Sequence, residues 1–205
     1  MATWSKDIRG SLHLRGKALA TEFLELNNLE VPKFFSYQEA VRETSPQIEV
    51  FRKKTKGGRC LGLYYDGYVF VNVEQTALPV GKGAWPGWKT DRTAAGVVAH
   101  EVGHHIAALW GLGLTRNWRE HLKLKERSRH VSGYEPTADE AWAETLRLFI
   151  LNPDLARQAL PWRCEFIEGS GIKPLKKLVR QGWRKVLGNV NYFEAAERWI
   201  SGGAK

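Results

Sequence analysis

Residues 90–111 read TDRTAAGVVAHEVGHHIAALWG, and they carry the pattern of a long helix. Thr90 or Asp91 can accept a hydrogen bond from the free backbone N–H groups of the first turn, which is how helices commonly begin. Gly111 and Gly113 follow, and glycine is the residue type that most often ends a helix. The stretch therefore predicts a helix that begins near residue 90 and ends near residue 110.

The centre of this helix carries the motif His-x-x-x-His with a glutamate after the first histidine, at His100, Glu101 and His104. Residues four apart share one face of a helix, so the two imidazoles can converge on one Zn²⁺ at about 2.0–2.1 Å. Glu101 can reach a metal-bound water instead of the metal. We therefore predict a Zn²⁺ site with His100 and His104 as ligands and Glu101 as general base. The alternative is that both histidines have purely structural contacts.

The opposite face of the same helix is apolar. Val98, Val102 and Leu109 lie roughly opposite the two histidines, and we expect them to pack on the core. Gly103 has no side chain, which lets another backbone approach closely. His105 points away from the ligand face by helical geometry, and we expect it either to pack against its neighbours or to support a residue that binds the metal.

A catalytic zinc needs a third protein ligand and one open position for water. Residues 138–151 predict a second helix, in which Glu140 and Glu144 lie four apart on one face and Arg147 follows three residues later. We assign Glu140 to the zinc, Glu144 to the support of a ligand histidine, and Arg147 to the neutralisation of excess negative charge. The alternative is an ordinary amphipathic helix with exposed ion pairs.

The ends and the apolar face of this second helix are also predictable. Thr137 or Asp139 is a suitable residue for its start. The face opposite the glutamates carries Trp142, Leu146 and Phe149, which we expect to face the core.

Taken together, these motifs resemble the gluzincin peptidases. The resemblance rests on His-Glu-x-x-His at 100–104, on Ser-Gly-Tyr at 132–134 and on EAWAETLR at 140–147. It is closest to the protease domain of anthrax lethal factor and its relatives, which include small phage and bacterial metallopeptidases. It covers about fifty residues within 90–151, and the loop at 135–137 is slightly shorter than in that family.

The resemblance implies an α+β, zincin-like metallopeptidase fold and a set of roles. His100, His104 and Glu140 would bind Zn²⁺, Glu101 would activate water, and Tyr134 would donate a hydrogen bond to the oxyanion. The function that follows is a zinc-dependent endopeptidase that hydrolyses the peptide bonds of a peptide or protein substrate.

A hairpin precedes the motif helix. Residues 59–65 and 68–73 are runs with β-branched and aromatic residues, and Asp66-Gly67 between them favours a two-residue turn. Zincin-like folds place an edge strand above the active-site helix, where an extended peptide substrate adds to the sheet. We expect either residues 68–73 or the partner strand to be that edge.

The remaining pattern completes a single α+β domain over residues 1–205. Helical periodicity is present in four further segments, residues 11–26, 37–44, 173–187 and 192–200, and residues 48–52 alternate like a strand. Residues 114–133 are polar and basic and predict no definite element.

The net charge of +9 favours anionic partners. Basic residues cluster within 52–59, 116–129 and 173–185, so nucleic acid is a possible partner. This charge motivates an alternative function, a catalytically inactive zincin-like module that binds nucleic acid or a host protein. No stretch approaches the roughly 18 apolar residues of a membrane helix, and residues 1–16 lack the apolar centre of a secretory signal. We therefore expect no membrane contact and a cytoplasmic location.

Two other zinc sites are conceivable. Cys60 precedes His100 by forty residues, and this arrangement faintly resembles the peptide deformylases, whose third ligand is an upstream cysteine. That family's glycine-rich segment with glutamine is missing, and the helix with Glu140 would be unexplained. A purely structural zinc is disfavoured because structural sites usually have four Cys or His ligands. With Cys164 the only other cysteine, no disulfide framework is expected.

Overall fold

The computed structural model describes residues 2–42, 45–55, 60–78, 86–125, 131–132 and 134–175. Its N-terminal half contains α1 (Ala2–Leu26), β1 (Lys33–Ser36), α2 (Tyr37–Arg42), α3 (Pro46–Thr55), β2 (Gly62–Tyr65), β3 (Tyr68–Val71) and the 3₁₀ turn η1 (Val73–Gln75). Its C-terminal half contains α4 (Ala94–Lys125), α5 (Ala138–Leu151), α6 (Pro153–Ala159) and α7 (Pro161–Gly169).

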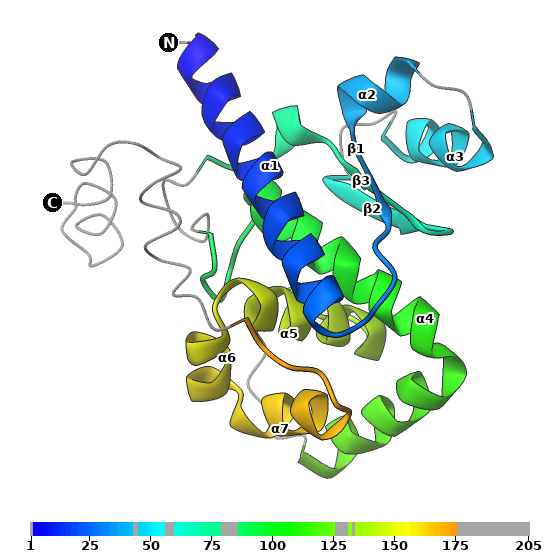
Figure 1. The fold of residues 1–205 in the computed structure, drawn as a ribbon, viewed down its shortest axis with the longest axis vertical. Coiled ribbons are helices and arrows are strands. Elements are labelled where there is room, and N and C mark those ends of the chain that lie inside the picture. The colour runs from blue at the N-terminus through cyan, green and yellow to red at the C-terminus, as the bar shows by residue number, and fades with distance from the viewer. Residues whose placement is uncertain are drawn as a thin grey trace, which may run out of the picture.

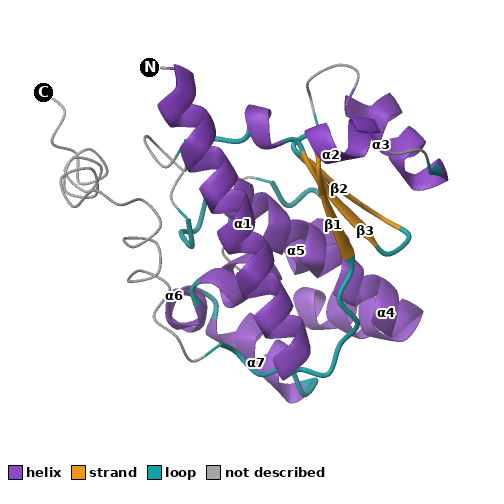
Figure 2. Ribbon diagram, turned by 45° about the horizontal axis from the view of Figure 1, so that its top comes forward, coloured by secondary structure: helices purple, strands orange, loops and turns teal. Residues whose placement is uncertain are grey.

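The structure is mixed α+β, mostly helical, with one small sheet. Helix α1 crosses α4, the sheet lies above α4 in the view of Figure 1, and α5, α6 and α7 lie below it. Figure 2 shows α2 and α3 beside the sheet. Of the two C-terminal helices that we predicted, residues 173–175 are not helical and the rest lies outside the described residues. Within the described residues, no helix is long and apolar enough to cross a membrane.

The predicted hairpin is confirmed. Asp66 and Gly67 have positive φ angles of 48° and 78°, as a tight two-residue turn requires, and β2 pairs antiparallel with β3. Strand β1 pairs in parallel with the other side of β3, so the order is β1-β3-β2. Residues 68–71 are therefore the central strand, which excludes them from the two strands that we considered for the edge. The partner strand β2 is an edge of this sheet.

The strand that we predicted at residues 48–52 is wrong, because this segment lies in α3. Ser45 caps the helix, since its hydroxyl oxygen accepts from the N–H of Ile48 at 3.2 Å, and a proline follows at the first helical position. Ile48 and Phe51 lie three residues apart, so they share one helix face and are both buried in a small cluster against β3. Five alternating residues are too few to distinguish this spacing from a strand.

Helix α4 begins later and ends later than we predicted. Thr93 caps it, because its hydroxyl oxygen accepts from the N–H of Gly96 at 3.3 Å. Asp91 lies two residues before this cap and accepts from the N–H of Thr93 at 3.0 Å. Gly111 breaks the helix with a φ of 70°, but residues beyond it are helical again because Trp118 is buried there. The tryptophan's Nε1–H donates to the carbonyl of Ala138 at 2.8 Å.

The core forms where α4 packs on its neighbours. Val98 and Val102 are buried as predicted, but Leu109 is 39% exposed. Residues 107–110 are all half-buried or exposed, so α4 leaves the core one turn before its break. The predicted apolar face of α5 is confirmed, with three buried side chains, Trp142, Leu146 and Phe149.

Gly103 is a point of close approach between α4 and α5. A Cβ atom at this position would lie 2.7 Å from the Cα of Ala143. The indole N–H of Trp142 donates to the carbonyl of Gly103 at 3.0 Å. The two helices therefore touch through their backbones, as the missing side chain of Gly103 suggested.

We expect Gly103→Ala to lower the free energy of unfolding by about 1–3 kcal/mol, because the new methyl group would push against the backbone of α5. Gly10→Ala is a matched control in α1, because no atom lies within 4 Å of a Cβ at that position. This control should stabilise the fold by about 0.5–1 kcal/mol through helix propensity. Chemical denaturation of both variants checks this, and a neutral or stabilising Gly103→Ala would contradict the packing described here.

Candidate metal centre

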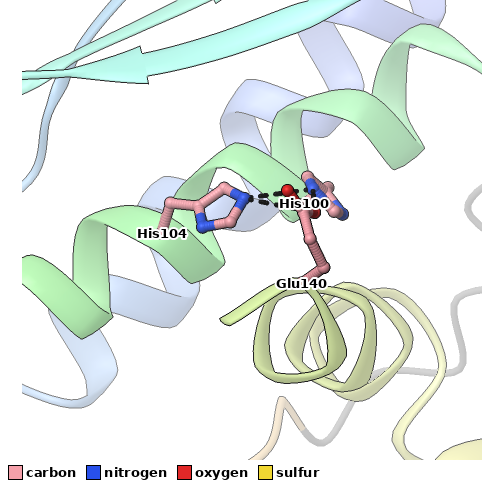
Figure 3. Close-up of side chains that lie close together, drawn as sticks. All are labelled: His100, His104 and Glu140. Atoms are coloured by element: carbon pink, nitrogen blue, oxygen red, sulfur yellow. Dashed lines mark hydrogen bonds and ion pairs between the residues drawn. The ribbon is translucent and has the colours of Figure 1, made fainter. Parts of the chain in front are cut away.

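Two helices bring the three predicted ligands together. His100 and His104 come from α4, Glu140 comes from α5, and one ligand atom of each lies within 4.8 Å of the other two. Figure 3 shows the three side chains converging between the helices. Gly103 lies between His100 and His104 in the sequence, and Ala143 lies between Glu140 and Glu144, so the backbone contact between the helices makes this convergence possible.

The three ligand atoms face one another at short range. The Nε2 atoms of His100 and His104 are 3.2 Å apart. Oε2 of Glu140 lies 3.1 Å from Nε2 of His100 and 3.6 Å from Nε2 of His104. This oxygen is buried and has no hydrogen-bond partner of acceptable geometry among the described residues.

Glu144 determines which nitrogen of His100 faces this group. Oε1 of Glu144 lies 2.8 Å from Nδ1 of His100, so this nitrogen is the donor to the carboxylate. In the neutral ring, Nε2 then has its lone pair directed at Glu140 and His104. Two ring nitrogens and one carboxylate oxygen therefore face one point, and the group could hold a metal ion once both rings are neutral. Two imidazoles and a carboxylate are a common ligand set of catalytic zinc.

The electrostatics favour positive charge at this point. Burial lowers the pKa of His100, but the carboxylates of Glu140 and Glu144 outweigh it and raise this pKa to about 9. Burial raises the pKa of Glu140, but the neighbouring imidazoles outweigh it and lower this pKa to about 2. The pKa of Glu144 falls to about 2 in the same way, through His100 and Arg147. The two carboxylates that stabilise the protonated form of His100 would also stabilise a metal cation bound at this position.

Arg147 lies behind Glu144 and is fully buried. Its Nε and Nη2 atoms donate to the two carboxylate oxygens of Glu144, each at 2.9 Å. It also donates to two loop carbonyls, to that of Trp88 at 2.9 Å and to that of Lys89. The structure therefore places Glu144 and Arg147 as we predicted, in a chain that leads outward from His100.

Glu101 lies between the metal-binding group and the sheet. It is buried, and it accepts a hydrogen bond from the backbone N–H of Tyr64 in β2. Burial raises its pKa, which the nearby His100 and His104 partly offset. The β2 strand comes so close that a Cβ on Gly62 would lie 2.5 Å from Oε1 of Glu101.

Tyr134 lies on the open side of the group. Its ring centroid is 6.0 Å from that of His100, and the residue is 56% exposed. Burial of its hydroxyl and the nearby carboxylates, Glu140 foremost, raise its pKa, so it is a hydrogen-bond donor at neutral pH. The structure thus brings all seven predicted site residues into one region.

Cys60 lies near this region but outside the ligand group. Its thiol donates to the carbonyl of Gly62 at 2.6 Å, and burial and the charge of Glu101 raise its pKa. The ligand group found among the described residues contains Glu140 and not Cys60, which weakens the deformylase-like alternative. Both cysteines are free, and His105 has the packing role that we expected, with its ring 5.4 Å from that of Tyr64.

Sequence reasoning missed the residues that support the site from outside the motifs. Gly62 had a usable signal, because a glycine inside a strand pattern often marks a close approach of another group. Glu135 and Arg163, which form a buried ion pair at 3.0 Å near Tyr134, had no such signal. Their meeting depends on where α7 packs.

No protein-family model matches the chain, and no match is found among curated proteins or among solved structures. The assignment of the site therefore depends on its own residues and geometry.

We expect zinc affinity to fall in a definite order when the site is altered. Glu140→Gln removes a ligand and should weaken binding most, whereas Glu144→Gln should weaken it by about 10–100-fold because the support of His100 is impaired. Cys60→Ser and Glu120→Gln, which removes an exposed carboxylate on α4, should bind as the wild type does. Competition with a chromophoric chelator measures this order. Loss of zinc from Cys60→Ser would instead favour a cysteine ligand.

Proposed function

We propose that the chain is a zinc-dependent endopeptidase with a zincin-like fold. The convergence of His100, His104 and Glu140, with Glu101 beside them under β2, is the observation that carries this proposal. Two nitrogens and one carboxylate leave a coordination position open, as a catalytic zinc requires. A zinc ion in this group would supply a Lewis acid that acidifies a water molecule and polarises the carbonyl of the substrate.

Glu101 would act as the general base and then as the general acid. Its carboxylate would take a proton from the attacking water and return it to the leaving amine. Burial raises its pKa, which makes this carboxylate a better proton acceptor than an exposed one. The hydrogen bond from Tyr64 and the lack of a side chain at Gly62 hold this carboxylate in place.

Tyr134 and Glu144 would support the reaction from two sides. The phenolic hydroxyl of Tyr134 would donate to the oxyanion that develops on the substrate carbonyl. Glu144 would keep the proton of His100 on Nδ1, and Arg147 would keep Glu144 ionised through its two hydrogen bonds. The roles of Glu144 and Arg147 use contacts that are already formed.

The edge of β2 suggests how a substrate would bind. The carbonyl of Leu61 accepts from the N–H of Asn72, so Gly62 and Tyr64 direct their backbone groups away from β3 in the alternating antiparallel pattern. This is the same edge that contacts Glu101. The N–H of Tyr64 already donates to Glu101 and the carbonyl of Gly62 accepts from Cys60, so an extended segment of polypeptide would pair with the other backbone groups of this edge and bring its scissile bond to the metal group. We therefore infer that the substrate is a peptide or an unfolded segment of a protein.

Binding of nucleic acid stays a prediction from the net charge. The basic clusters at 52–59, 116–129 and 173–185 extend into parts of the chain outside the described residues. Nothing in the geometry of the metal-binding group favours the inactive binding module over the peptidase.

We expect Glu101→Gln to keep its zinc and to lose activity by roughly 10²–10⁴-fold, because the amide cannot accept the proton of the attacking water. Hydrolysis of fluorescently labelled, denatured casein measures activity, and elemental analysis measures zinc. Glu120→Gln on the same helix is the matched control and should be fully active. Full activity of Glu101→Gln would contradict the assigned mechanism, and a wild type that binds zinc but cleaves no substrate would favour the binding module.

A further inference from the structure

The backbone next to Tyr134 is fixed by hydrogen bonds to the buried side chain of the following residue, Glu135. Tyr134 itself is more than half exposed, so its own side chain contributes little to its position. Glu135 turns inward instead, and its Oε1 atom accepts from the backbone N–H groups of Val131 at 2.5 Å and Ser132 at 3.2 Å. A single carboxylate therefore closes the loop around the tyrosine.

Arg163 of α7 holds this carboxylate from the other side. Its Nη1 and Nη2 atoms each donate to Oε2 of Glu135 at 3.0 Å, and the two side chains are only 2% and 1% exposed. Nη1 also donates to the hydroxyl of Thr145 at 3.0 Å. The guanidinium lies 5.9 Å and 5.3 Å from the ring centroids of Trp118 and Trp162.

This network connects the loop to the helix that carries the metal ligand. Thr145 follows Glu144 directly on α5, so Arg163 bonds the same helix that presents Glu140 and Glu144. The loop and the ligands are thereby fixed to a common support. Buried ion pairs rarely add net stability, because the desolvation of both charges offsets their attraction. A role in fixing one conformation explains such a pair better than a role in stability does.

We propose that Glu135 and Arg163 are positioning residues that hold Tyr134 over the metal-binding group. The role of Tyr134 in this inference rests on the proposed peptidase function. The hydrogen bonds by which Glu135 and Arg163 fix the backbone next to Tyr134 do not depend on that function. Glu135 acts on the loop through the backbone N–H groups of Val131 and Ser132, just before Tyr134, whose ring centroid lies 6.0 Å from that of His100. Loss of the Glu135 charge would free the tyrosine and leave the metal ligands in place.

The test uses the full-length, zinc-loaded protein and the variants Glu135→Gln, Tyr134→Phe and their combination. Hydrogen exchange measured by mass spectrometry reports on the loop without any assay of activity. We expect Glu135→Gln to speed exchange in the segment 131–135, and zinc affinity to stay within about threefold of the wild type, since no ligand is changed. Glu168→Gln, which breaks an exposed ion pair with Arg157 on the same part of the fold, is the control and should change neither.

Kinetics with a fluorogenic peptide found by library screening provide the second measurement. We expect Tyr134→Phe to lower kcat by about 10²–10³-fold, as loss of an oxyanion donor does, with little change in KM. Glu135→Gln should lower kcat by part of that amount in the wild-type background. It should lower kcat no further in the Tyr134→Phe background, because the group that it positions is already gone.

The outcomes separate the two proposals. Equal losses of kcat from Glu135→Gln in both backgrounds, or faster exchange throughout α5 and α7, would show a general structural role and overturn the inference. If the wild type cleaves no peptide, the proposed function fails, and faster exchange confined to 131–135 at unchanged zinc affinity still supports the positioning role of Glu135.

If Glu135→Gln does not fold, Ser132→Ala replaces it. Ser132 accepts from the N–H of Tyr134 at 3.1 Å, and its loss buries no charge.

Discussion

The backbone contact between α4 and α5 at Gly103 is the constraint on which the rest of the site depends. A Cβ atom there would meet the Cα of Ala143 at 2.7 Å, so only glycine permits this approach. The histidine ligands lie on either side of Gly103 in the sequence, and the two glutamates lie on either side of Ala143. One close contact, fixed by the hydrogen bond from Trp142, therefore brings both polar faces together in the interior.

Charged and polar side chains that are buried together need partners of opposite charge or hydrogen bonds, and in this site each charged group is paired with the next one outward. Glu140 and Glu144 surround His100, Arg147 neutralises Glu144, and its remaining donors bond the carbonyls of the loop that precedes α4. Buried charge without such partners would be strongly unfavourable. A cation shared by His100, His104 and Glu140 would satisfy the remaining lone pairs. The buried oxygen of Glu140 is where this compensation is incomplete in the protein alone.

The side chains of the candidate site could be predicted from spacings within single helices. The features that depend on contacts between elements could not. Ligands at spacings of four lie on one helix face whatever surrounds the helix, so His100, His104, Glu140 and Glu144 were identifiable from the sequence. The Asp-Gly turn was equally local. Helix α3 and the exposure of Leu109 depend on how each segment meets the core, and the place of β3 at the centre of the sheet depends on its pairing with β1. The pairing of Glu135 with Arg163 across 28 residues follows only from the position of α7.

X-ray absorption spectroscopy at the zinc edge of the zinc-loaded protein tests the central claim most directly. The claim predicts one zinc per chain with only nitrogen and oxygen neighbours at about 2.0–2.1 Å, and multiple scattering from two imidazoles. A sulfur neighbour at about 2.3 Å would mean that a cysteine binds the metal. That result, or a protein that retains no zinc after reconstitution, would contradict the assignment of His100, His104 and Glu140 as a catalytic zinc site.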